Sequence, residues 1–182
     1  MEPELNISFF RQDVLKVAPQ LLGKIIRLKT AMGSRYFFVT ETEAYRGEED
    51  LGCHCSKGRT KRTEIMYHAG GVYYVYLIYG MYWMLNIVSG KVNQPQAVLI
   101  RGIKEFDVET GKILANYNGP GKTGKVLGVD KLFYGMSILQ NEQFGILNEN
   151  FPTARSKIKM APRVGIDYAG DEWKNTQWRF IL

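Results

Sequence analysis

Two glutamates stand two residues apart where a predicted strand ends, in the order Glu41, Thr42, Glu43. Side chains alternate between the faces of an extended strand, so an unbroken pleat puts both carboxylates and Tyr45 on one face. If that face is buried, the carboxylates need partners, because an isolated buried carboxylate is neutralised. A strand-end carboxylate that opens onto a cleft is a candidate general base. The alternative is that both side chains reach solvent or pair with arginines.

A second group of reactive side chains surrounds His54, which lies between Cys53 and Cys55, with His68 further along. Together they offer four metal-ligating side chains within sixteen residues. Thiolates that converge on zinc are usually spaced C-x₂-C, and the His-Glu and Cys-x-x-Cys pattern of zinc deaminases is missing. We therefore expect no metal, and favour His54 as a hydrogen-bonding group in a pocket over a histidine in a plain loop.

The segment Gly119-Pro-Gly-Lys-Thr-Gly-Lys has the composition of a phosphate-binding loop. Neither alignment of the pattern G-x-x-x-x-G-K-[ST] fits, because one needs Ser or Thr at Val126 and the other needs Gly at Asn116. A nucleotide-hydrolysing enzyme is therefore disfavoured. Backbone amides beside Lys122 and Lys125 can still hold one phosphate of a nucleic acid at a helix start.

An aromatic residue occupies a predicted hairpin tip, Tyr79-Gly80-Met81. Such tips face water and usually carry Asn-Gly, Asp-Gly or Gly-X. A tyrosine held there can act as a wedge that enters the minor groove and replaces a base that has left the stack. The alternative is an exposed tyrosine without a role in DNA binding, or a dimer contact.

These residues need a scaffold, for which the patterns predict an α+β fold with a mostly antiparallel sheet and helices packed against it. A helix is expected from Asp13 to Leu22, capped by Asp13 and kinked or split by Pro19. A functional loop is expected over 46–63, and helices and loops rather than strands beyond residue 110. Strands are predicted at residues 24–29, 35–43, 72–78, 82–89 and 97–103, the first two joined as a hairpin.

Composition limits the class of protein. The 182 residues suit one domain, and 24 Lys and Arg against 18 Asp and Glu give a net charge of +6. Four of the positive charges lie within residues 57–62, as a basic patch or a solvated loop. The N-terminal residues show no secretory signal, and the two cysteines suit a reducing compartment, so we expect a cytoplasmic protein. The apolar run from Val72 to Val88 alternates like strands and carries five tyrosines, which argues against a membrane span.

Several of these motifs occur together in one known family. The chain resembles the alkyladenine (3-methyladenine) DNA glycosylases in the segment Glu41-Thr-Glu-Ala-Tyr45, in His54 nine residues later, in residues 71–82, in Asn86 and in Ala97-Val-Leu-Ile-Arg101. A looser match covers most of the rest, including Gly119 to Lys122 and Arg163-Val-Gly-Ile. The resemblance implies one domain over 1–182, with a curved antiparallel sheet and a protruding β-hairpin.

The resemblance also implies a role for each matching position. Glu43 would activate a water held by Arg101 and the backbone carbonyl of Val164, with Glu41 as a neighbour rather than the base. Tyr45 and Tyr76 would sandwich a flipped base while His54 hydrogen-bonds it. Asn86 would repel the 2-amino group of guanine, Tyr79 would fill the vacated stack, and Lys122 would contact DNA.

The implied reaction is hydrolysis of the N-glycosidic bond of an alkylated or deaminated purine, such as 3-methyladenine, hypoxanthine or an etheno-adduct, in base-excision repair. The substrate would be double-stranded DNA, and we expect a monomer without cofactor. No lysine stands at the motif positions to form a Schiff base, so a monofunctional enzyme without strand cleavage is expected.

Two alternatives remain at this point: a catalytically silent module that binds damaged DNA, which would not need Glu43 with Arg101, and a zinc enzyme. The chain also departs from the family pattern at four positions, where relatives tend to have small or hydroxyl residues, proline or asparagine: Cys53, Cys55, Lys61 and Thr63.

Overall fold

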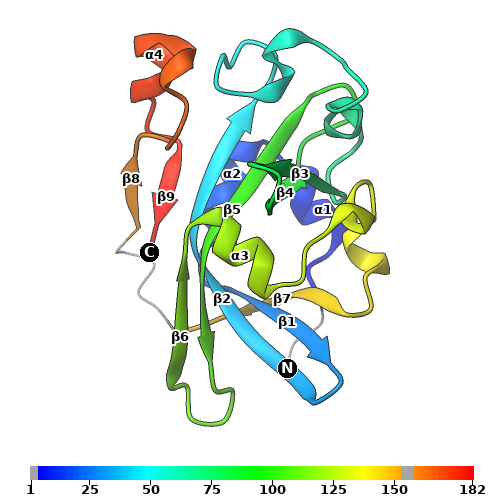
Figure 1. The fold of residues 1–182 in the computed structure, drawn as a ribbon, viewed down its shortest axis with the longest axis vertical. Helices are drawn as coiled ribbons and strands as arrows, with labels where there is room; N and C mark the ends of the chain where they lie inside the picture. The colour runs from blue at the N-terminus through cyan, green and yellow to red at the C-terminus, as the bar shows by residue number, and fades with distance from the viewer. Residues whose placement is uncertain (1–3, 153–157) are drawn as a thin grey trace.

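A nine-stranded sheet forms the framework of the protein, for which the computed structural model describes residues 4–152 and 158–182. Every pairing between the named strands is antiparallel. Strands β2 and β5 run the length of the molecule, with α2 behind them and α3 in front (Figure 1). The predicted α+β fold, with a mostly antiparallel sheet and helices packed on it, is confirmed.

The strands are β1 (Lys24–Thr30), β2 (Gly33–Arg46), β3 (Tyr73–Ile78), β4 (Tyr82–Val88), β5 (Gln96–Phe106), β6 (Ile113–Asn118), β7 (Phe144–Asn150), β8 (Lys159–Ala161) and β9 (Arg179–Ile181). The α-helices are α1 (Ile7–Phe10), α2 (Val14–Leu21), α3 (Pro120–Val126) and α4 (Gly170–Asn175). Short 3-10 helices span His54–Lys57, Glu64–Tyr67, Lys131–Phe133, Ile138–Gln140 and Asp167–Ala169.

Strand β2 is a central strand of the sheet. Its first half pairs with β1 through the predicted hairpin, and its second half lies between β5 and β9. The pairing of β2 with β5 shifts register on both sides of Glu41, so that Thr40 on β2 and Arg101 on β5 have no direct partner. Such irregularities bend a strand and re-aim its side chains. Gly102 follows Arg101 and gives room for the bend, since a Cβ there would lie 3.1 Å from the Cβ of Glu41.

The main core lies between the sheet and α2. Val14, Val17, Ala18 and Leu21 of α2 are fully buried against apolar residues of the central strands. The predicted cap is present, because the Asp13 side chain accepts a hydrogen bond from the backbone N–H of Leu15. Pro19 lies inside the helix but does not split it, in contrast to one of the two expectations from the sequence.

Strands β3 and β4 form the predicted hairpin, with Tyr79 and Gly80 at its tip. Both residues have positive φ, at 52° and 67°, as a type I′ turn requires. Helix α3 supports β4 through two glycines without Cβ atoms: Gly121 lies against the Tyr82 ring, and a Cβ on Gly124 would lie 2.1 Å from the Trp83 carbonyl oxygen. The predicted strands of the apolar run at 72–88 are thus present, and no described helix is long and apolar enough to span a membrane.

The expectation of helices and loops rather than strands beyond residue 110 is only partly right. Helices α3 and α4 and 3-10 helices form there, but so do the strands β6, β7, β8 and β9. β6 is a mostly exposed strand that pairs with the far half of β5, and β8 and β9 are three-residue strands that complete the sheet beside β2. Short polar strands of this kind form because a partner strand is available, and their sequences carry little strand signal. The predicted loop at 46–63 likewise contains the 3-10 helix His54–Lys57.

Candidate active site

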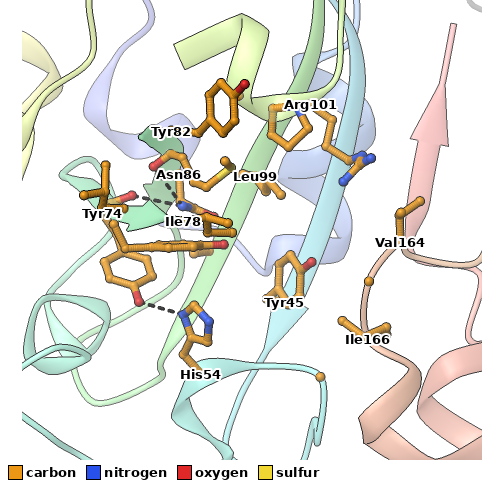
Figure 2. A pocket seen from close by; sticks show the side chains of 18 of the residues that line it. Tyr45, His54, Tyr74, Ile78, Tyr82, Asn86, Leu99, Arg101, Val164 and Ile166 are labelled. Atoms are coloured by element: carbon orange, nitrogen blue, oxygen red, sulfur yellow. Dashed lines mark hydrogen bonds between the residues drawn. The ribbon is translucent and has the colours of Figure 1, made fainter. Parts of the chain in front are cut away.

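A cavity of about 800 Å³ opens between β2, β5, the β3–β4 hairpin, the start of α3 and the segment 164–168. Its wall includes eight of the nine residues predicted for the site: Tyr45, His54, Tyr76, Tyr79, Asn86, Arg101, Lys122 and Val164. Figure 2 shows Tyr45, His54 and Asn86 around one space, with Arg101 and Val164 beside it. The structure therefore brings together side chains that are separated by more than a hundred residues in the chain.

The ninth residue, Glu43, lies directly behind this wall. Its side chain is fully buried, and three groups of the cavity wall contact its carboxylate. The Tyr45 hydroxyl donates to Oε2 at 2.8 Å, the backbone N–H of Val164 donates to Oε1 at 2.8 Å, and Nε of Arg101 lies 3.4 Å from Oε1. The carboxylate is thus one layer of hydrogen-bonding groups away from the cavity.

The surroundings of Glu43 act on its pKa in opposite directions. Burial raises the pKa above its ordinary value of 4.5, and this effect is the largest. Arg101, the Val164 N–H and the Tyr45 hydroxyl lower the pKa, and the net shift is upward. A buried carboxylate with a raised pKa and cationic and hydrogen-bonding partners has the character of a catalytic base.

Arg101 reaches the two glutamates because of the register shift between β5 and β2. Its Nε lies 3.0 Å from Oε1 of Glu41, and Arg179 of β9 approaches the same oxygen at 3.5 Å. Both glutamates therefore face one side of β2, as the strand alternation predicts, and Glu41 pairs with arginines. Pairing with arginines was one of the alternatives that the sequence left open for these two carboxylates, and the structure shows it for both.

His54 is held by a tyrosine that sequence reasoning assigned only to sheet packing. The Tyr74 hydroxyl lies 2.7 Å from Nδ1 of His54, as Figure 2 shows, so Nε2 is the ring nitrogen left for another partner. Burial, together with the charge of Arg62, lowers the pKa of His54 to about 4, so the imidazole is neutral at cellular pH. The alternation of Tyr74 with Tyr76 along β3 is the sequence signal that could have indicated this partner.

The cavity holds two further polar features. The Asn86 amide is buried, and its Nδ2 donates to the carbonyl oxygen of Tyr74 at 3.1 Å, which fixes the side chain in one orientation. The exposed Arg62 places its guanidinium 4.9 Å from the centre of the Tyr76 ring. Burial raises the pKa of Tyr76 to about 12. The sequence indicated Arg62 only as part of the basic segment 57–62, and its position in the cavity wall was not predicted.

The tip of the hairpin and the start of α3 lie at the outer part of the cavity. Tyr79 is 87% exposed, and Met81 beside it is 65% exposed. Lys122 is exposed in the first turn of α3. An aromatic tip and a basic side chain next to one opening suit a polyanion with flat bases.

Comparison with known proteins decides the family. A family model described as methylpurine-DNA glycosylase matches residues 8–182. The chain belongs to this family. Relatives named "Putative 3-methyladenine DNA glycosylase" come from Borrelia garinii subsp. bavariensis, 41% identical over 96% of this chain and 93% of the relative, and from Natranaerobius thermophilus, 36% identical over 98% and 95%. A third, from Sodalis glossinidius, is 41% identical over 97% of this chain and 95% of the relative.

Membership of the methylpurine-DNA glycosylase family confirms the predicted resemblance and class of enzyme: the chain is a DNA glycosylase, an enzyme of DNA repair. It disfavours a catalytically silent DNA-binding module.

The zinc alternative finds no support in the arrangement of the side chains. Cys53 and Cys55 are buried, and Sγ of Cys55 contacts Sδ of Met66 at 3.4 Å, whereas His68 is exposed. Among the described residues, no group of three or more His, Cys, Asp and Glu side chains is placed to hold a metal ion.

Proposed function

We propose that this protein is a monofunctional glycosylase that hydrolyses the N-glycosidic bond of 3-methyladenine in double-stranded DNA. The observation that supports the proposal most is the position of Glu43, which three groups of the cavity wall hold at the edge of an aromatic cavity. We propose further that the chain acts as one domain over residues 1–182, as a monomer in the cytoplasm, and needs no cofactor.

Glu43 is the proposed catalytic residue. Departure of the purine leaves positive charge on the deoxyribose, and an ionised carboxylate stabilises that charge and takes a proton from the attacking water. Because contacts to Tyr45, Val164 and Arg101 already cover the carboxylate, one of them must open to admit the water. In this proposal Arg101 and the Val164 carbonyl then hold that water, and Glu41 keeps Arg101 in place.

The base would enter the cavity by flipping out of the duplex. Tyr45 and Tyr76 would offer their rings, the Nε2 of neutral His54 would hydrogen-bond the base, and fixed Asn86 would exclude the 2-amino group of guanine. Cationic alkylated purines are good leaving groups, whereas neutral bases such as hypoxanthine or etheno-adducts need protonation. We therefore propose 3-methyladenine as the preferred base and the neutral lesions as slower substrates.

The DNA would lie across the opening of the cavity. Tyr79 would fill the space of the flipped base, and Lys122 with the basic segment 57–62 would contact phosphates. Phosphate contacts orient the duplex without reading sequence, which suits an enzyme that must inspect DNA of any sequence.

The central test is the substitution Glu43→Gln. We expect it to abolish release of 3-methyladenine while binding to a duplex with an abasic-site analogue stays largely intact, because the amide keeps the shape and loses the negative charge. Released base is measured over a panel of single-lesion duplexes, and binding by fluorescence anisotropy. Glu105→Gln is the matched control, because Glu105 pairs with Arg35 and does not line the cavity.

Turnover retained in the Glu43→Gln variant would remove Glu43 from the mechanism. A wild-type protein that binds lesion duplexes and releases no base would instead favour the silent module.

A further inference from the structure

A buried ion pair lies behind the cavity wall, between Asp50 and Arg163. Nη1 of Arg163 lies 2.6 Å from Oδ2 of Asp50, Nη2 lies 2.7 Å from Oδ1, and both side chains have no exposed surface. Such a two-pronged contact fixes the direction of the guanidinium as well as its position. The roles proposed above do not involve either residue.

The Arg163 guanidinium is also held by groups outside the pair. Nη1 donates to the carbonyl oxygen of Ala44 at 3.0 Å. The guanidinium carbon lies 4.8 Å from the centre of the Tyr45 ring and 5.2 Å from that of Trp178. Arg163 therefore joins β2, the residues before β9 and the segment that follows β8.

Asp50 organises the segment that leads to His54. Its Oδ1 accepts the backbone N–H of Gly52 at 2.9 Å, and its Oδ2 accepts that of Arg46 at 3.1 Å. Its carbonyl oxygen accepts the N–H of Cys53 at 2.8 Å. Asp50 and Arg163 are 113 positions apart in the sequence, so the pair ties the strand of Tyr45 and the loop of His54 to the distant segment that carries Val164.

Arg163 directly precedes Val164, whose N–H bonds Glu43. Gly165 follows with a φ of +78°, a conformation that favours glycine and turns the chain at this point. The position of the Val164 N–H is therefore set on one side by the fixed Arg163 and on the other by the turn.

A buried ion pair is not in itself a strong source of stability, because apolar side chains of similar volume are often as good or better. A lysine could not replace the arginine here, since it lacks the planar fork that bonds two oxygens and stacks on rings. This pair therefore supplies a fixed relative position of three segments rather than stability.

We propose that Arg163, held by Asp50, is a positioning residue that keeps the Val164 N–H on Glu43 and the Tyr45 ring at the cavity. The effect on catalysis rests on the proposed role of Glu43, whereas the effect on the geometry does not. Arg163 acts through Val164 and Tyr45. Through these two residues it fixes both the Tyr45 ring at the cavity and the hydrogen bond to the Glu43 carboxylate.

The first test follows the Val164 amide in ¹⁵N-labelled protein by NMR across a pH titration. In the wild type the Val164 amide proton should titrate with its carboxylate partner Glu43. In Arg163→Lys, and in the paired variant Arg163→Met with Asp50→Asn, we expect this response to be lost. The paired variant leaves no single buried charge, so it keeps the test available if Arg163→Lys does not fold.

The second test measures single-turnover base release with saturating enzyme, together with affinity for an abasic-analogue duplex. A displacement of about 1 Å can cost on the order of 100-fold in rate, so we expect a loss of at least roughly tenfold with unchanged affinity. Arg35→Lys is the matched control, because Arg35 makes a two-pronged pair with Glu105 away from the cavity. It should lower thermal stability without changing the Val164 response or the rate.

The outcomes separate the two proposals. A folded Arg163 variant that keeps both the Val164 response and the wild-type rate would overturn the positioning role. A wild-type protein that releases no base, with the Val164 response still lost in the variants, would support the positioning role and contradict the proposed function.

Discussion

Glu43 combines full burial with a complete set of hydrogen-bonding partners. Burial favours the neutral acid, whereas Arg101, the Val164 N–H and the Tyr45 hydroxyl favour the ionised form. In the proposed mechanism the acid must be ionised to take a proton from water, so base release should fall as the pH decreases through the raised pKa of Glu43. His54 does not contribute to this fall, because its pKa is lowered to about 4 and its imidazole is already neutral where Glu43 titrates.

Removing the Tyr45 hydroxyl provides a test of this balance. Tyr45→Phe keeps the ring and deletes the hydrogen bond that lowers the pKa of Glu43, so that pKa should rise further. The acidic side of the pH–rate profile, its acid limb, should therefore move to higher pH, so that the variant loses most rate at the acidic end and recovers it at alkaline pH. Single-turnover rates across pH measure this. A limb that stays in place, or moves to lower pH, would contradict the assignment of the limb to Glu43.

At the scale of elements, the β3–β4 hairpin places a residue in a conformation that it does not favour. Tyr79 has a φ of 52° in a turn where Asn or Gly would fit without strain, and its ring is 87% exposed. Neither the turn nor packing within the protein accounts for a tyrosine. An unfavourable backbone conformation kept at a surface position is often linked to function.

Tyr79→Ser tests the hairpin as a wedge. Loss of one aromatic–base stack should weaken binding to lesion duplexes by about 1–3 kcal/mol. Dissociation constants measured at fixed salt give the change. Met32→Ser is the control, because Met32 is fully exposed at the tip of the β1–β2 hairpin. An unchanged dissociation constant for Tyr79→Ser would leave the wedge without support.

The sequence predicted elements best where apolar alternation is strong. Both strands of the β3–β4 hairpin and the central parts of β2 and β5 were predicted, and the Glu41–Glu43 spacing placed both carboxylates on one face. The strands beyond residue 110 were missed, because β6 alternates weakly and depends on β5 for its pairing. The register shift that brings Arg101 to Glu41, and the contact of Arg163 with Asp50, depend on tertiary pairing that no local pattern reports.

At the scale of the whole molecule, the net charge of +6 suits a protein that binds a polyanion. The basic side chains of segment 57–62 lie near one edge of the cavity through Arg62, and Lys122 lies at another. Binding that depends on phosphate contacts releases counterions from DNA, so affinity should depend on salt.

We expect affinity for duplex DNA to fall steeply as salt increases. The slope of log affinity against log salt should become less steep by about one for each phosphate-contacting lysine that is removed. Lys122→Gln tests this, and Lys112→Gln in the loop between β5 and β6 is the control. Salt-independent binding, or an equal change in both variants, would argue against the proposed DNA-binding surface.

One strand, β2, carries Glu41, Glu43 and Tyr45 and at the same time pairs with β1, β5 and β9. The proposed chemistry therefore lies on a strand with partner strands on both sides, a kind of backbone whose amide protons are among the slowest to exchange with solvent. Heating should leave the active site assembled until the sheet itself melts, so that inactivation and unfolding would be one event.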